Sequence, residues 1–491
     1  MRDERIKPMR FNDLMSALPP IWPEDLLPRI RERIALLGGK LIVLDDDPTG
    51  CQTVHNVPLY TRWDEGSLRS ALSEESHLVY ILTNSRSLTP DKAADLARTI
   101  GERLSKLSQE LGVRVFPVSR SDSTLRGHFP AETEALAEGL SVEFDAVFII
   151  PFFLEGGRYT VDDVHWVRQN DMMIPAAQTE YARDPAFGYG HSYLPRWVEE
   201  KTGGRVRENE VKRISIRELR EEGPEGIGRK LSELEDGDIV IVNAADYRDL
   251  DVLSLALLDA EILGKRFLYR TAASFVRSRG GILPRGLLSS EELTPQGEVE
   301  PGALVIVGSY VERTTRQMQR LFGMTDTVGI EVRIADLLGE RRGKTIEKAI
   351  REANEAVRKG LIAVLFTERR PVKGTTPEET LRIGRRISSA LVEIVKGLNV
   401  RPSFILSKGG ITSHDIAVEG LGVRNSMVLG QVYPGVPVWR VNGIPYVVFP
   451  GNVGDDEAMV EVVRRLKGED QEPRVYCSST LDPAPRPSAQ R

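Results

Sequence analysis

The ten residues from Leu41 to Gly50, LIVLDDDPTG, constrain the fold of this chain more than any other stretch. Four apolar residues, 41–44, form a run that is typical of a buried strand. Three carboxylates follow directly, and Pro48, Thr49 and Gly50 then supply a turn, because proline fixes φ and glycine can adopt positive φ. Ligands of open α/β sheets bind just beyond the carboxyl ends of the strands. The stretch therefore predicts a strand that ends in a functional acidic turn.

The three adjacent carboxylates, Asp45, Asp46 and Asp47, decide between two interpretations of this turn. Like charges repel, and their removal from water is costly unless a cation, backbone amides or a substrate compensates them. A single aspartate here would be interpreted most simply as the cap of the next helix. With three, we predict a site for a substrate or a metal, and the capping turn stays as the alternative.

Strand-like and helix-like runs alternate along the chain, which predicts an α/β fold with largely parallel sheets. In the first half, three further apolar runs each open into polar residues at their carboxyl ends; these runs are 77–83, 113–119 and 145–151. A polar stretch with proline and glycine at 289–302 predicts a domain boundary, after which the pattern restarts. We expect two domains, 40–290 and 300–467, each with its own sheet flanked by helices, and a site in the cleft between them.

The remaining segments are predicted to carry less regular structure. Residues 1–39 are expected to form a proline-interrupted preamble with one helix at about 24–37, and residues 468–491 a disordered tail. Between about Val161 and Gly204 the apolar periodicity lapses. We predict an irregular excursion there, which lies either near the site or simply at the surface.

The composition excludes several classes of protein. Lys and Arg number 66 against 72 Asp and Glu, and a net charge of −6 offers no general attraction to nucleic acid or to an anionic membrane. The two cysteines, Cys51 and Cys477, cannot form a disulfide framework or a zinc site by themselves. No apolar run approaches the roughly 20 residues that span a bilayer, and no secretory signal is visible. We therefore expect a cytoplasmic protein without nucleic-acid or membrane partners, and a homodimer stays open.

The second half contains three loops rich in glycine, each directly after a predicted strand. They comprise Gly308-Ser309, Lys408-Gly409-Gly410-Ile411-Thr412 and Gly451-Asn452. Glycine lets backbone amides approach phosphate oxygens, and the N-terminus of a following helix adds a favourable dipole. One such loop would be an ordinary turn, whereas three on one sheet edge favour a nucleotide site. Neither a Walker P-loop nor the G-x-G-x-x-G dinucleotide motif occurs.

The first half carries charged and hydroxyl side chains after its strands. They are Arg120, Asp122, Ser123, Arg126 and Arg158. Arginine forks suit a substrate carboxylate, and aspartate suits a hydroxyl proton or a metal. Helix capping would explain Asp122 or Ser123 equally well. The histidines lack metal-binding spacing, so we expect them to serve as hydrogen-bonding groups.

In this order, the motifs resemble those of the four-carbon acid sugar kinase family, formerly a domain of unknown function. Residues 46–50 are similar to the family's Asp-Asp-x-Thr-Gly turn, and residues 122–127 to its second motif. The three glycine-rich loops resemble its ATP-binding segments. The resemblance covers about residues 41–466 and implies an acid-sugar domain followed by a nucleotide domain. It also implies ATP-dependent phosphorylation of a threonate, erythronate or 3-oxo-tetronate.

The resemblance also suggests roles for individual residues. We expect Asp46 or Asp47 to act as the base or to orient the acceptor hydroxyl. The acid is expected to contact Thr49, Gly50, Arg120, Asp122, Ser123, Arg126 and Arg158. ATP is expected at Ser309, Lys408, Gly409, Gly410, Ile411, Thr412, Gly451 and Asn452, with Mg²⁺ bridging its phosphates, and no protein ligand of the metal is predicted. Asp45, Pro48 and Arg120 depart from the family's pattern and indicate a distinct branch.

Two functions of other classes stay open at this point. An NAD-dependent sugar-acid oxidoreductase would suit the fold, although the missing dinucleotide motif counts against it. A non-catalytic sugar-acid sensor would need an altered acidic turn, and this turn is intact.

Overall fold

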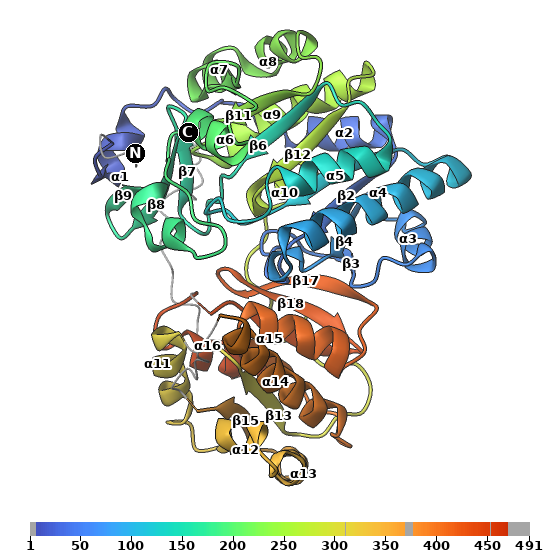
Figure 1. Cartoon of the computed structure of the whole chain (residues 1–491), viewed down its shortest axis with the longest axis vertical. Helices are drawn as coiled ribbons and strands as arrows, with labels where there is room; N and C mark the ends of the chain where they lie inside the picture. Colours follow the sequence, from blue (N-terminus) through green and yellow to red (C-terminus); the bar gives the residue numbers. More distant parts are fainter. Residues whose placement is uncertain (1–5, 310, 369–376, 452, 470–491) are drawn as a thin grey trace, which may run out of the picture.

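The computed structural model describes residues 6–309, 311–368, 377–451 and 453–469. The chain forms two α/β parts that follow one another along the long axis of the molecule (Figure 1). The first part contains the blue to yellow-green segments, and the second contains the yellow to red ones. The predicted α/β class is confirmed. No helix within the described ranges has the length and hydropathy needed to cross a membrane.

The first part is built on eight parallel strands. Across the sheet they are β10 (Lys212–Ile214), β11 (Asp238–Val242), β6 (Ala146–Ile150), β12 (Phe267–Thr271), β5 (Val115–Arg120), β2 (Lys40–Asp45), β4 (Leu78–Leu82) and β3 (Val57–Tyr60). The central strand β2 is apolar on both faces. Ile42 and Leu44 pack in one cluster with helices α4 (Pro90–Leu111) and α5 (Ala131–Leu140). Leu41 and Val43 pack in another, with α2 (Leu27–Leu37) and α9 (Tyr247–Ile262).

Strand β2 lies where the direction of the sheet order reverses. The chain leaves β2 toward β3 and β4 on one side, and then continues with β5, β6 and β12 on the other. Asp45, the last residue of β2, is in register with Leu82 of β4 and Arg120 of β5. A crevice forms at such a switch point because the following connections diverge to opposite faces. The fold therefore places the acidic turn at the position where an open α/β sheet binds its ligand.

The second part repeats this arrangement around β13. Its strands, across the sheet, are β17 (Asn425–Tyr433), β18 (Val436–Val441), β19 (Ile444–Phe449), β16 (Ile405–Lys408), β13 (Ala303–Val307), β15 (Ile362–Thr367) and β14 (Thr327–Val332). The strands from β19 to β14 are parallel, whereas β18 is antiparallel to both of its neighbours, β17 and β19. Strand β13 lies between β16 and β15, so a second switch point falls at the carboxyl ends of β13 and β16.

The two sheets are continuous, which the sequence did not predict. Strand β3 pairs antiparallel with β17, and the result is one sheet of 15 strands. Buried side chains reinforce this seam: the Trp439 Nε1 donates to Cys51 Sγ over 3.2 Å, and Thr61 Oγ1 donates to the Val423 carbonyl over 2.5 Å. Burial raises the pKa of the Cys51 thiol to about 12, so this thiol is protonated and unreactive. Cys477 and most of the predicted tail fall outside the described residues.

The preamble and the excursion form one antiparallel sheet on the side of the first part. Its order is β1 (Met9–Arg10), β9 (Met172–Pro175), β8 (Val164–Gln169) and β7 (Arg158–Val161). The prediction of an irregular segment is wrong for these strands, because two tight hairpins hold them. Their two-residue turns, 162–163 and 170–171, have positive φ at Asp162 (51°), Asp163 (62°) and Asn170 (54°). Asp and Asn tolerate this conformation well, and it matches the twist of hairpin strands.

Candidate active site

Asp45 belongs to the layer beneath the acidic turn. It is fully buried, and its Oδ1 lies 3.1 Å from Nη1 of Arg120 on the neighbouring strand. Burial raises the pKa of Asp45 to about 7, although Arg120 opposes the shift. A side chain at Gly50 would overlap the Asp45 carboxylate, so Gly50 permits the turn to fold over it. Gly50, predicted to contact the acid, has this packing role in the structure.

Both carboxylate oxygens of Asp46 accept hydrogen bonds from neighbouring side chains. Arg86 binds it in a bidentate manner, with Nε 3.1 Å from Oδ2 and Nη2 2.5 Å from Oδ1. Ser121 Oγ donates to Oδ2 over 2.9 Å. Its side chain is buried, and these contacts occupy most of its acceptor positions. The structure makes Asp46 a junction between the turn and two neighbouring strand ends.

Asp47 is the most accessible of the three carboxylates, with 20% of its side chain exposed. Its Oδ1 accepts hydrogen bonds from the backbone N–H and the hydroxyl of Thr49. Its Oδ2 lies 3.6 Å from Arg86 Nη1. Burial acts to raise the pKa of Asp47, but Arg86 and Thr49 outweigh it and the pKa is lowered. Asp47 is therefore an ionised carboxylate with an accessible oxygen.

Arg86, which sequence reasoning did not assign, connects the whole acidic cluster. It lies just after β4, and its guanidinium also comes within 3.8 Å of Asp122 Oδ1. Burial acts to lower the pKa of Arg86, and Asp46, Asp47 and Asp122 raise it well above its ordinary value. The only signal in the sequence was its place at a strand end in Asn84-Ser85-Arg86. One arginine after a strand carries no spacing that identifies a role.

The predicted arginines divide into two groups. Arg120 has only 5% of its side chain exposed and lies behind the turn, between Asp45 and Asp46. Arg126 donates from Nε to Asp122 Oδ2 over 2.8 Å. The guanidinium groups of Arg126 and Arg158 lie 5.2 Å and 5.6 Å from the centre of the Tyr181 ring. Arg126 and Arg158 are thus gathered at one ring, whereas Arg120 supports the turn from beneath.

Asp122 and Ser123 lie at the beginning of the second motif. Arg126 and Arg86 outweigh the burial of Asp122 and lower its pKa. Ser123 is buried, and its carbonyl oxygen lies 2.7 Å from His165 Nε2. Burial lowers the pKa of His165 to about 4, so this histidine is a neutral hydrogen-bonding group, as the sequence predicted for the histidines generally.

Arg270 is a second arginine that the sequence did not single out. It is buried at the end of β12, where Nη2 donates to the Arg126 carbonyl over 3.1 Å. Its Nε and Nη1 have no hydrogen-bond partner among the described residues. Burial lowers its pKa to about 10, although Asp46 and Asp122 oppose this. The first switch point therefore carries a cation whose hydrogen-bonding capacity is only partly used.

In the second part, the three glycine-rich loops converge on Ser309. A Cβ on Gly409 would lie 3.3 Å from the Ser309 Cβ, and one on Gly451 would lie 3.0 Å from the Ser309 Oγ. Gly308 is packed against the Thr412 side chain in the same way. Gly409 also has φ of 111°, which side chains rarely adopt. The first two loops are more than 100 residues apart along the chain. All three nevertheless lie side by side and form one backbone surface.

Other residues predicted to contact ATP have different surroundings. Lys408 is completely buried, and its Nζ donates to the Pro450 carbonyl over 2.7 Å and lies 3.6 Å from the centre of the Phe449 ring. Burial lowers its pKa well below the ordinary value. This amine supports the third loop from beneath. Ile411 is 63% exposed beside Gly410, and Asn452 lies outside the described residues.

The two switch points face each other. A Cβ built on Gly410 would lie 3.0 Å from Asp47 Oδ2, so the acidic turn of the first part lies directly against the second glycine-rich loop. Gly410 opens the short helix α15 (Gly410–Asp415). The described residues contain no group of three or more His, Cys, Asp or Glu side chains arranged to hold a metal. The Asp47 carboxylate and the backbone of Gly410 are therefore direct neighbours across the junction of the two parts.

The comparisons with known proteins agree with this geometry. Residues 41–279 match the family described as a sugar-binding N-terminal domain, and residues 304–459 match the family described as a nucleotide-binding C-terminal domain. A 3-oxo-tetronate kinase from Pseudomonas savastanoi pv. phaseolicola is 25% identical over 361 residues, which cover 71% of this chain and 78% of that protein. The chain belongs to the four-carbon acid sugar kinase family.

Solved structures confirm the fold of this kinase family member. A Haemophilus influenzae protein of a domain-of-unknown-function family has a TM-score of 0.61 at 17% identity and covers 87% of this chain and 100% of its own. A protein from Salmonella typhimurium LT2 has a TM-score of 0.63 at 17% identity, with coverage of 86% and 98%. Residues 1–40, including β1 and α2, precede the family match, whereas the other three strands of the four-stranded sheet, β7, β8 and β9, lie within it.

Proposed function

We propose that this protein is an ATP-dependent kinase that transfers a phosphoryl group to a hydroxyl of a small sugar acid. The observation that carries the proposal is the contact between Asp47 and the loop of Gly410. In phosphoryl transfer the protein mainly positions the reactants and stabilises charge. A carboxylate opposite a phosphate-binding loop is the arrangement that this reaction needs, because the acceptor hydroxyl must lie in line with the terminal phosphate.

Of the two predicted catalytic residues, we assign the role to Asp47. Asp46 is held by Arg86 and Ser121, whereas Asp47 retains an accessible oxygen. The lowered pKa of Asp47 keeps it ionised, so it accepts a hydrogen bond from the acceptor hydroxyl and orients it. A carboxylate with a lowered pKa is a weak base, and this favours orientation over early proton removal.

The nucleotide is proposed to lie over Ser309, Gly409, Gly410, Thr412 and Gly451. Because these glycines lack a Cβ, a phosphate can approach their backbone closely, and the Gly409 N–H is already donated to the Phe449 carbonyl. Mg²⁺ binds through one or two carboxylates together with substrate phosphates and water, and Asp47 fits that donor set as an ionised, accessible carboxylate facing the loop. When bound, Mg²⁺ neutralises phosphate charge.

The acid is proposed to occupy the first switch point, near Thr49, Asp122, Arg126 and Arg158. The relatives named 3-oxo-tetronate kinases support a sugar acid as the acceptor. Arg158 has no ion pair among the described residues, and its Nε has no hydrogen-bond partner there, so it can donate a hydrogen bond to an oxygen of the acid. A cytoplasmic location and a homodimer stay predictions.

An ATP-consumption screen with Mg²⁺ across four-carbon and longer sugar acids tests the proposal. We expect turnover with at least one acid and its loss in the Asp47→Asn variant. Reduction of NAD in place of ATP consumption would favour an oxidoreductase. Binding of an acid without ATP turnover would favour a sensor, and either result would contradict the kinase assignment.

A further inference from the structure

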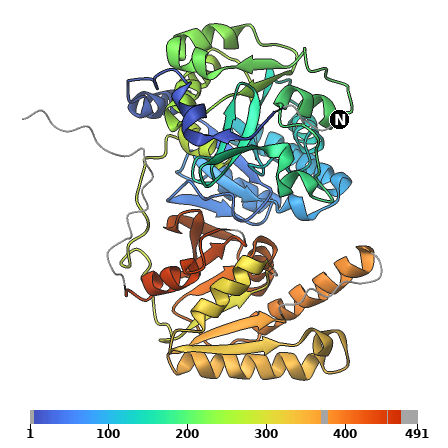
Figure 2. The same ribbon diagram turned by 90° about the vertical axis from the view of Figure 1, so that its left-hand side faces the viewer.

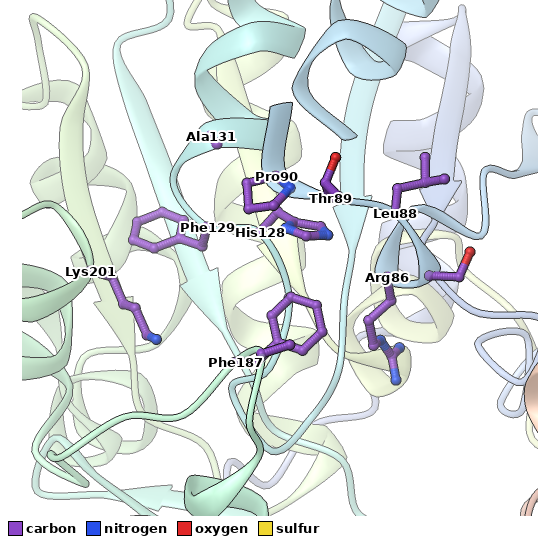
Figure 3. Close-up of a pocket in the computed structure, with 12 residues that line it drawn as sticks. Arg86, Leu88, Thr89, Pro90, His128, Phe129, Ala131, Phe187 and Lys201 are labelled. Carbon is purple, nitrogen blue, oxygen red and sulfur yellow. The ribbon is translucent and has the colours of Figure 1, made fainter. Parts of the chain in front are cut away.

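A cavity of about 470 Å³ opens beside the acidic turn (Figure 3). Two of its lining residues connect it with the turn. Arg86 lines the cavity and binds Asp46, and a Cβ on Gly127, which also lines it, would lie 3.4 Å from Asp46 Oδ2. The cavity therefore lies beside the first switch point and shares Arg86 with it. Its volume falls within the roughly 300–1,000 Å³ of small-molecule sites.

The walls combine apolar side chains with a few polar groups. Leu88, Pro90 and Phe129 supply apolar surface. His128 and Phe187 contact each other edge to face, with ring centres 4.9 Å apart, and Figure 3 shows this pair between Arg86 on one side and Lys201 on the other. Burial lowers the pKa of His128, so the ring is neutral near pH 7. A ligand that runs from Arg86 to Lys201 would pass this pair of rings.

Lys201 is the cation of the cavity that forms no ion pair with the described residues. It ends helix α6 (Leu194–Lys201), and its Nζ donates to the Gly188 carbonyl over 2.8 Å. Within the described part of the chain it makes no ion pair, and the adjacent Glu200 instead accepts from the Gly190 N–H. Burial lowers the pKa of Lys201; the charge of Glu200 opposes this shift, and the charge of Arg270 adds to it.

Three of the other cations near the turn differ from Lys201 in this respect, whereas Arg158 and Arg270 also form no ion pair among the described residues but do not line the cavity. Arg86, Arg120 and Arg126 each form an ion pair with at least one aspartate. An anion that enters the first switch point finds those charges already compensated. Lys201 is partly buried, faces the cavity and lacks such a partner, so an incoming carboxylate gains most by reaching it.

We propose that this cavity binds the carboxylate end of the sugar acid, with Lys201 as its ion partner, and that the acid is longer than four carbons. The inference rests on the proposed kinase function and specifies its substrate. The acceptor hydroxyl lies at Asp47, and the carbon chain passes Arg86 and the His128–Phe187 pair to reach Lys201. A four-carbon acid would leave much of a 470 Å³ cavity empty and its apolar wall in contact with water.

The test separates ligand binding from a structural role of the lysine. Lys201→Gln should raise the KM for five- and six-carbon aldonates about 10- to 100-fold, the loss expected for one charge-assisted hydrogen bond. The KM for ATP should be unchanged, and Lys201→Arg should restore most of the acid affinity. The amide of the same acid should bind the native protein and Lys201→Gln equally well, because it presents no charge to Lys201.

Lys40→Gln is the matched control. Lys40 is also a partly buried lysine that donates to backbone carbonyls and whose pKa is lowered by burial, but it lies at the opposite end of β2. We expect this variant to lower the melting temperature without changing the KM for the acid. If Lys201→Gln likewise lowers the melting temperature without changing the KM for the acid, Lys201 only stabilises the loop at Gly188 and the proposal is wrong.

Further outcomes would show which part of the proposal is wrong. A preference for four-carbon acids over longer ones would overturn the proposed chain length. If no acid supports ATP turnover, calorimetry of the acids without ATP decides: binding that depends on Lys201 supports the cavity assignment while the kinase function fails. Turnover with an acid KM that is insensitive to Lys201→Gln overturns the cavity assignment and leaves the kinase function intact.

Discussion

The two switch points of the sheet use opposite means to prepare for a ligand. The first is assembled from charged side chains: Asp46, Asp47 and Asp122 surround Arg86 within 4 Å. The second is assembled from glycines around Ser309, whose missing side chains bring three loops together. Figure 2 shows the two parts one above the other with their facing edges between them. The first site should therefore respond to a change of charge, and the second to a change of volume.

The largest effect, on kcat, is expected from removal of the Asp47 charge. Asp47→Asn keeps the shape of the turn but removes the charge that orients the acceptor hydroxyl, so kcat should fall by about 10²- to 10⁴-fold. The native fold should persist, because Arg86 keeps Asp46 and Asp122 as partners. Steady-state kinetics and thermal melting measure the two quantities.

Asp46→Asn provides the comparison within the same turn. This variant weakens the bidentate contact with Arg86, and we expect it to lower the free energy of unfolding by about 3–5 kcal/mol, as for a broken buried ion pair. If Asp46→Asn alone abolishes turnover while Asp47→Asn is active, the two roles are exchanged.

The next largest effect is expected from added side-chain volume at the second switch point. Gly409→Ala adds a Cβ that points at Ser309 at a φ that alanine rarely adopts, and such strain costs about 1–3 kcal/mol. The affinity for ATP should fall by about tenfold or more, and the affinity for the acid should be unchanged. Gly384→Ala is the control, since nothing lies within 4 Å of a Cβ there. Calorimetry with each ligand would contradict the comparison if both affinities fell together.

A smaller effect is expected from Arg126→Lys, which keeps the charge and removes the planar fork. Arg126 contacts Asp122 and Asp184 and stacks on Tyr181, and lysine cannot make all of these contacts at once. The KM for the acid should rise several-fold and more than the KM for ATP. Equal increases in both constants would indicate that this arginine faces the phosphates.

The last prediction concerns the pH dependence of stability, on which the activity at neutral pH depends least. The pKa of Asp45 is raised to about 7 by burial, so the folded protein holds a proton that the unfolded chain releases near pH 4. This contribution is complete below about pH 4 and is lost as the pH rises to about 7. Asp45→Asn should therefore gain about 4 kcal/mol relative to the native protein between those pH values. Parallel stability curves for the two proteins would contradict the shift.

The sequence predicted the parts that depend on local pattern. Apolar runs such as 41–44 and 303–307 became fully buried central strands, because a run without alternation suits a strand covered on both faces. The glycine-rich loops after β13, β16 and β19 were found for the same reason, since a glycine at a strand end is visible without knowledge of the neighbours. Their convergence on Ser309 depended on strand order, which an α/β pattern restricts but does not fix.

The residues that the sequence missed act through partners far away in the chain. Arg86 meets Asp46 only because β4 lies beside β2, and Lys201 reaches the cavity from the end of a helix, 74 residues beyond Gly127. One missed element did carry a local signal: Asn442-Gly443, with φ of 49° and 83°, is the two-residue turn between β18 and β19. Asn-Gly is a strong hairpin signal, and its recognition would have predicted the antiparallel strands at this edge.

The pairing of β3 with β17 has a consequence for how the reaction is timed. A kinase whose halves are joined by a flexible linker must bring phosphate and acceptor together in every catalytic cycle. Here, backbone hydrogen bonds and the contact between Trp439 and Cys51 fix the acidic turn against the glycine loop in the folded chain itself. The entropy cost of positioning the two sites relative to each other is thus incurred once, during folding. Reactants that are held in a good orientation can gain an effective concentration of about 10⁵–10⁸ M.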